Sequence, residues 1–161
     1  MNKELLPTIL TLLKTYDLPP NVLSFEMTEG HLVQDLVKAV KQLATVRDTG
    51  FKIAIDDFGT GYSSLSYLSR LPADILKIAK SFVLKLNEQG SDQTIVKSVI
   101  ELGHQFGMEI VAEGVENQSS LELLDECGCE WVQGYHICRP IAAASFIHWF
   151  KEFDANILSS K

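Results

Sequence analysis

The stretch IAIDDFGTGYSS, residues 53–64, ends an apolar run on two adjacent carboxylates and then turns through glycines. Asp56 and Asp57 follow residues that we expect to be buried, so at least one carboxylate should lie at the edge of a core. Like charges this close raise each other's pKa unless a cation or hydrogen-bond donors offset them. We therefore expect a divalent cation beside the pair. The same letters also make a good turn, so a capping and turn role remains the alternative.

Four further polar residues lie within or at the end of apolar runs: Glu26, Lys77, Glu113 and Gln133. Taken singly, each has a structural explanation. Glu26 can be a paired core carboxylate, Lys77 can extend its ammonium group to solvent from a strand end, and Gln133 alone is uninformative. Only their joint pattern favours a functional site.

Carboxylate oxygens are the ligands preferred by hard divalent cations such as Mg²⁺ or Mn²⁺. Adjacent aspartates can hold two ions, and two-metal sites suit in-line displacement at phosphorus. Lys77 could orient the attacking water or neutralise charge in the transition state. Glu113 could bind the second ion or activate water, and Glu116 is a candidate to support it from the following turn.

The elements that must position these residues alternate between strand and helix. The apolar patterns predict five strands within residues 22–28, 51–57, 74–82, 108–115 and 130–135. Helical spacing predicts intervening helices within residues 4–16, 31–50, 63–71, 92–107, 118–128 and 142–153. Such alternation indicates parallel strands and an α/β fold, either a doubly wound sheet or a barrel. Polar residues near the ends of consecutive strands favour the barrel, because there all strand ends meet at one mouth.

The composition limits the class of protein. With 161 residues, 46% apolar and 22% charged, the chain is one globular domain or part of one. Its formal net charge of -7 argues against binding a DNA or RNA polymer. No apolar run approaches the roughly 18 residues of a membrane helix, and the N-terminus lacks a signal-peptide pattern, so we expect no membrane segment and a cytoplasmic location. Cys127, Cys129 and Cys138 lack zinc-site spacing and are expected to be reduced.

Several motifs resemble those of EAL domains, bacterial phosphodiesterases that act on the second messenger cyclic di-GMP. FEMTE resembles the E-x-T-E segment of the family, and DDFGTGYSSLSYL resembles its most specific motif. LKIA is similar to its lysine-containing strand, VAEGVEN to its A-E-G-V-E turn, and VQGYHICRP to its Q-G-Y…P ending. The motifs occur in family order and extend over nearly the whole chain.

The resemblance implies a TIM-type (β/α) barrel and hydrolysis of one phosphodiester bond of cyclic di-GMP, giving linear pGpG, with two Mg²⁺ or Mn²⁺ ions. Carried over by position, Glu26 and Asp56 are metal ligands, with Asp56 bridging the ions. Asp57 and Glu113 bind the second ion, and Lys77 holds the hydrolytic water.

The resemblance also implies roles for residues around that centre. Glu116 and Gln133 would complete the substrate pocket. Glu29 would brace the loop at residues 57–64, and in the family this loop also contributes to a homodimer.

Two departures from the family pattern affect these expectations. No counterpart of the name-giving E-x-L strand or of the next strand, each with a metal ligand, is found. By resemblance the chain is therefore the C-terminal portion of a single domain, residues 1–161, an incomplete barrel with about five of eight strands. In addition, Ala79 stands where the family usually has Asp. We expect little or no turnover from these residues alone. The alternative is a non-catalytic remnant that binds nucleotide or partners weakly.

Overall fold

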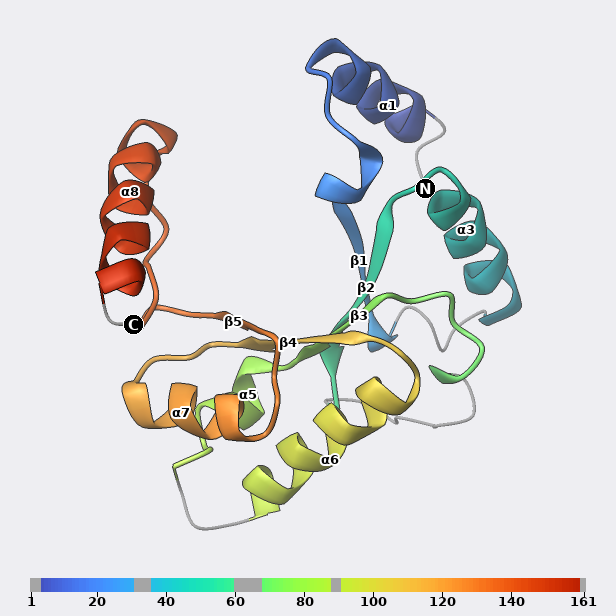
Figure 1. Cartoon of the computed structure of the whole chain (residues 1–161). Helices are drawn as coiled ribbons and strands as arrows, with labels where there is room; N and C mark the ends of the chain where they lie inside the picture. The colour runs from blue at the N-terminus through green and yellow to red at the C-terminus, as the bar shows by residue number, and fades with distance from the viewer. Residues whose placement is uncertain (1–3, 31–35, 60–67, 88–90, 160–161) are drawn as a thin grey trace.

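A computed structural model describes residues 4–30, 36–59, 68–87 and 91–159, and Figure 1 shows the whole chain. Its helices, including one short 3-10 helix, are α1 (Leu5–Thr15), η1 (Pro20–Val22), α3 (Leu36–Asp48), α5 (Lys80–Val83), α6 (Ser91–Gln105), α7 (Gln118–Glu126) and α8 (Ala143–Ser159). Its strands are β1 (Ser24–Thr28), β2 (Lys52–Phe58), β3 (Ile75–Ile78), β4 (Glu109–Glu113) and β5 (Trp131–Gln133).

The five strands form one parallel sheet in the order β1-β2-β3-β4-β5, so each strand pairs with its neighbours along the chain. The sheet is curved, with α3 and α6 on its outer side and α1 and α8 beyond its two ends (Figure 1). This arrangement confirms the predicted α/β fold. Because consecutive strands are adjacent and parallel, their carboxyl ends lie along the same edge of the sheet.

The two faces of the sheet differ in polarity because side chains alternate along each strand. The outer, helix-covered face carries the largest apolar residues of the central strands, which are 0–1% exposed: Ile53, Ile55, Leu76, Ile78 and Ile110. The register places Glu26 beside Ala54 and Glu113 beside Gln133 on the inner face. The hydrophobic core therefore fixes the sheet against the helices, while Glu26, Lys77 and Glu113 lie on the other face.

Two carboxylates that directly precede strands, Asp74 before β3 and Glu130 before β5, accept hydrogen bonds from backbone N–H groups near the start of the neighbouring strands β2 and β4. Asp74 Oδ2 accepts a hydrogen bond from the backbone N–H of Ile53 at 3.0 Å, and Asp74 Oδ1 pairs with Arg47 Nη2 at 2.8 Å. Glu130 Oε2 likewise accepts from the N–H of Ile110 at 2.9 Å. These contacts satisfy backbone groups that would otherwise be buried without a partner.

Two sequence-based expectations need correction. The third strand ends at Ile78, and residues 80–82 of the predicted strand 74–82 belong instead to the short helix α5. In the helix predicted within residues 31–50, the helical spacing of apolar residues places both Val37 and Leu43 on the buried face, but Val37 is 69% exposed, whereas Leu43 is 4% exposed. Residues 31–35 and most of the predicted helix 63–71 lie outside the described part of the chain.

Among the described residues, every helix is too short or too polar to cross a membrane.

A candidate metal centre at the carboxyl ends of the strands

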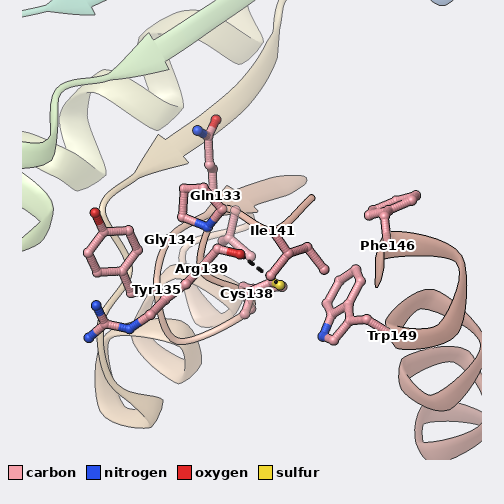
Figure 2. A pocket seen from close by; sticks show the side chains of 11 residues that line it. Gln133, Gly134, Tyr135, Cys138, Arg139, Ile141, Phe146 and Trp149 are labelled. Atoms are coloured by element: carbon pink, nitrogen blue, oxygen red, sulfur yellow. Dashed lines mark hydrogen bonds between the residues drawn. The ribbon is translucent and has the colours of Figure 1, made fainter. Parts of the chain in front are cut away.

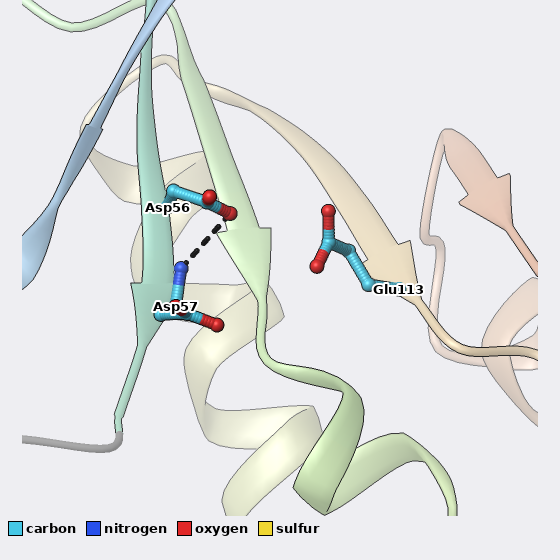
Figure 3. Close-up of side chains that lie close together, drawn as sticks. All are labelled: Asp56, Asp57 and Glu113. Carbon is cyan, nitrogen blue, oxygen red and sulfur yellow. Dashed lines mark hydrogen bonds between the residues drawn. The ribbon is translucent and has the colours of Figure 1, made fainter.

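Asp56 and Asp57 lie on the same side of the sheet although they are neighbours in a strand. A regular strand would point them to opposite faces. Here the pairing of β2 with β3 shifts register between Ile55 and Phe58, and Asp57 has a φ of 55°, in the left-handed region. The backbone N–H of Asp57 also donates to Asp56 Oδ1 at 3.0 Å (Figure 3). This local irregularity is what brings the two carboxylates together.

Glu113 completes a group of three carboxylates. It is the last residue of β4 and points toward Asp56 and Asp57 across the end of β3 (Figure 3). One oxygen from each of the three residues lies within 4.8 Å of the other two. Three convergent carboxylate oxygens are a donor set that suits a hard cation such as Mg²⁺ or Mn²⁺. The residues present therefore fit the metal that the sequence pattern predicts.

Lys77 lies among Glu26, Asp56, Asp57 and Glu113, which together form the acidic cluster. Its side chain is 8% exposed, and its Nζ contacts Glu113 Oε1 at 2.7 Å, Glu26 Oε1 at 2.9 Å and Asp56 Oδ1 at 3.2 Å. Burial lowers the pKa of Lys77, but the hydrogen bonds to Glu113, Glu26 and Asp56 outweigh it, so the pKa is raised above its ordinary value. Lys77 is therefore a permanent ammonium group that partly neutralises the carboxylates around it.

Two glycines let the turns after β4 and β5 meet beside Glu113. Gly114 has a φ of 78°, and a Cβ there would lie 2.3 Å from Cγ of Lys80. A Cβ on Gly134 would lie 2.0 Å from the backbone oxygen of Val115, whose N–H donates to the oxygen of Gln133 at 3.1 Å. Only glycine allows these close approaches.

The same turns form a pocket of about 210 Å³ lined in part by Glu113, Glu116 and Gln133. Lys80 and Tyr135 line it as well, and Lys80 Nζ pairs with Glu116 Oε1 at 2.8 Å. The structure thus places both predicted pocket residues next to Glu113, on the side of β4 that faces β5.

Glu29 directly follows β1 and contacts the loop that follows β2. Its side chain is almost fully buried, and its Oε2 accepts a hydrogen bond from the N–H of Gly59 at 3.1 Å. This contact ties the end of β1 to the residue that follows β2. The rest of the predicted dimer loop, residues 60–64, lies outside the described residues.

Sequence reasoning missed three residues beside the centre: Lys80, Tyr135 and Arg139. The guanidinium carbon of Arg139 lies 4.6 Å from the centroid of the Tyr135 ring, and Lys80 Nζ lies 5.4 Å from it. Tyr135 stands in the QGY motif, but residue type alone does not indicate that two cations contact its ring.

A second pocket, of about 410 Å³, lies between the segment after β5 and α8 (Figure 2). Its walls are largely apolar, with Ile141, Phe146 and Trp149 among them, and none of the described residues that line it is a carboxylate. In Figure 2, Tyr135 and Arg139 lie together on the side away from Phe146 and Trp149. The acidic cluster and this pocket are therefore chemically distinct.

Comparison with known proteins identifies this arrangement. The model of the EAL domain matches residues 1–140. The cyclic di-GMP phosphodiesterase NbdA of Pseudomonas aeruginosa is 39% identical over 135 residues, which is 83% of this chain and 17% of NbdA. The first three curated relatives are also much longer, and the chain spans between 17% and 21% of their length.

Solved structures agree with the sequence comparison. The PaMucR phosphodiesterase in complex with c-di-GMP superimposes with a TM-score of 0.83 at 38% identity, over 90% of this chain and 59% of that chain. The manganese and cyclic di-GMP complex of BlrP1 from Klebsiella pneumoniae superimposes with a TM-score of 0.78 at 33% identity, over 86% of this chain and 36% of that chain. The five parallel strands therefore correspond to part of a TIM-type barrel.

Proposed function

The chain belongs to the EAL domain family, and from that membership we propose that residues 1–161 are the C-terminal portion of one such domain, used for metal-dependent hydrolysis of cyclic di-GMP to linear pGpG. The observation that carries this proposal is the convergence of Asp56, Asp57 and Glu113 within 4.8 Å. Complexes of two related proteins, one with c-di-GMP and one with manganese and the same nucleotide, support the substrate and the metal.

Glu26, Asp56, Asp57 and Glu113 are the residues proposed to hold the ions. When bound, Mg²⁺ or Mn²⁺ supplies positive charge at the phosphate and lowers the pKa of water. Asp56 is the proposed bridging ligand, because it lies close to Asp57 and Glu113 and shares the ammonium group of Lys77 with Glu26. Glu26 is exposed, with 47% of its side chain accessible, and contacts the Nζ of Lys77.

Lys77 and Glu113 are the proposed catalytic residues. The ammonium group of Lys77 donates hydrogen bonds, so it can hold a water molecule by its oxygen and stabilise negative charge on the phosphate. The carboxylate of Glu113, 2.7 Å from that ammonium group, can accept the proton that the water loses. The water oxygen bonds to phosphorus, the bond from phosphorus to a ribose oxygen breaks, and that oxygen takes up a proton to become a hydroxyl group. The product is a linear dinucleotide with a terminal phosphate.

Glu116, Gln133 and Glu29 are proposed to act around this centre. The first two line the pocket beside Glu113 and are placed to contact the nucleotide. Glu29 is proposed to hold the loop at residues 57–64 through the N–H of Gly59, and this loop is the proposed homodimer contact.

The proposal is tested by incubating an excess of the purified chain with cyclic di-GMP and Mn²⁺ and separating pGpG by chromatography. We expect little turnover, because Asp56, Asp57 and Glu113 supply few of the oxygen ligands that two divalent ions take. Product should be absent in EDTA and in Asp56→Asn. Asp125→Asn, the same substitution on an exposed face of α7, is the matched control and should retain activity. Product formation that persists in Asp56→Asn would contradict the proposal.

The alternative is a module that binds cyclic di-GMP or a protein partner without hydrolysing it. The observation in its favour is Ala79, which is 2% exposed, directly follows β3, and stands where family members usually have Asp. Binding of cyclic di-GMP that depends on Mn²⁺, without pGpG after prolonged incubation, would favour this alternative over hydrolysis.

A further inference from the structure

The acidic cluster poses an electrostatic problem for any anionic ligand. Glu26, Asp56, Asp57 and Glu113 carry four formal negative charges, and Lys77 is already shared among three of these carboxylates. Metal ions can attract the phosphate that they contact. A cyclic dinucleotide has a second phosphate, and opposite charge must be found for it elsewhere on the protein.

One source of such charge lies around the side chain of Tyr135. Its ring lines the same pocket as Glu113, is 51% exposed, and is contacted by Lys80 and Arg139. Gly134, the residue before Tyr135, lies against the backbone of Val115. The contacts of Lys80 and Arg139 with the ring place two cations beside the pocket that Glu113 also lines.

The two cations differ in their availability. Lys80 is paired with Glu116 at 2.8 Å, so its charge is largely neutralised. Arg139 is exposed and, within the described part of the chain, has no carboxylate partner. Its guanidinium carbon lies 4.6 Å from the centroid of the Tyr135 ring (Figure 2). A planar guanidinium group held in this way keeps its N–H donors free in a fixed direction, which suits a phosphate.

We propose that Arg139, held against Tyr135, binds the phosphate of cyclic di-GMP that is not cleaved. The proposal rests on the proposed function, because it takes the substrate from it. Arg139 is then a substrate-binding residue outside the metal centre, and Tyr135 is a positioning residue that acts through it.

The test is the dissociation constant for cyclic di-GMP with Mn²⁺ at 4 °C, measured by calorimetry together with the dissociation constant for Mn²⁺ alone. A charge-assisted hydrogen bond contributes about 1.5–3 kcal/mol, so Arg139→Gln should weaken nucleotide binding by about 10- to 100-fold. Tyr135→Leu should weaken it by about 2- to 5-fold, because an exposed cation–π contact contributes about 0.5–1 kcal/mol. The affinity for Mn²⁺ should be unchanged in both variants.

Arg70→Gln is the matched control. Arg70 is exposed and precedes β3, at the opposite end of the strands from the cluster, so its loss should leave binding unchanged. Raising NaCl should weaken binding to the wild-type chain more than binding to Arg139→Gln, because a phosphate contact is screened by salt.

Each contrary result has a distinct meaning. Wild-type affinity in Arg139→Gln, or an equal loss in Arg70→Gln, would overturn the proposal while leaving the proposed function intact. Equal salt dependence in wild type and Arg139→Gln would assign the contact to an uncharged part of the nucleotide and would also overturn it. A wild-type chain that binds no cyclic di-GMP would overturn both this proposal and the proposed function.

Discussion

Replacing Lys77 by methionine should destabilise the metal-free chain, and an added divalent ion should restore most of the lost stability. The substitution keeps a long side chain but removes the ammonium group that lies 2.7–3.2 Å from three carboxylates. Glu113, Asp56 and Glu26 would then repel one another without a central cation. An added divalent ion should replace the missing charge.

The magnitude follows from burial. Removing one partner of a fully buried ion pair costs about 3–5 kcal/mol. Lys77 is 8% exposed, but the three carboxylate side chains are 21–47% exposed and retain part of their hydration. We therefore expect Lys77→Met to lower the free energy of unfolding by about 2–3 kcal/mol in EDTA.

Urea denaturation, with and without saturating Mn²⁺, measures this effect. Mn²⁺ at a hundredfold excess over its dissociation constant stabilises a folded protein by about 2.7 kcal/mol. Because the variant has lost the competing ammonium group, Mn²⁺ should stabilise it more than it stabilises the wild type. The difference between the two proteins should fall below about 1 kcal/mol.

Lys80→Met is the matched control. Lys80 also contacts a carboxylate at 2.8 Å, but the pair is exposed to solvent, so the substitution should cause little change in either buffer. A loss of stability in Lys77→Met that Mn²⁺ does not reduce would contradict this prediction. So would a loss no larger than that of the control.

Three other substitutions or modifications test separate features of the structure. Asp57→Asn should raise the free energy of unfolding in EDTA by about 0.5–1 kcal/mol, because asparagine tolerates the left-handed backbone and the substitution removes a like charge. The same substitution should abolish stabilisation by Mn²⁺, and urea denaturation measures both effects. Asp74→Ala should destabilise the chain by about 1–3 kcal/mol, because the buried N–H of Ile53 loses its acceptor; thermal unfolding measures the loss, and an unchanged midpoint would contradict it. Burial raises the pKa of Cys129 from 9.0 to about 11. At pH 8 its alkylation in the folded chain should therefore be about a hundredfold slower than in urea, as mass spectrometry can show, and equal rates would mean that the thiol is not buried.

The sequence pattern predicted the parts of the site that depend on strand ends. Glu26, Lys77 and Glu113 each interrupt an apolar run, and in a parallel sheet such positions converge whatever the details of packing. The pattern could not predict that Asp57 points to the same side as Asp56, because the period-two rule for strands implies the opposite. That orientation depends on one residue with positive φ and one shift in register.

Other differences have similar causes. Residues 74–82 include no glycine or proline, so no residue type in this segment indicates that β3 ends at Ile78. Val37 fits the helical period, but the period does not determine which face meets the sheet. The contact of Arg139 with Tyr135 joins residues of an irregular segment, where no periodic pattern exists.

The backbone conformation of Asp57 also bears on the history of the chain. Asparagine and glycine fit a φ of 55° with less strain than aspartate, and each is one nucleotide change away from an aspartate codon. A lineage that no longer needed a carboxylate at this position would be free to drift toward either one. An aspartate kept at position 57 in related sequences would therefore indicate that selection maintained the carboxylate for its chemistry rather than for folding.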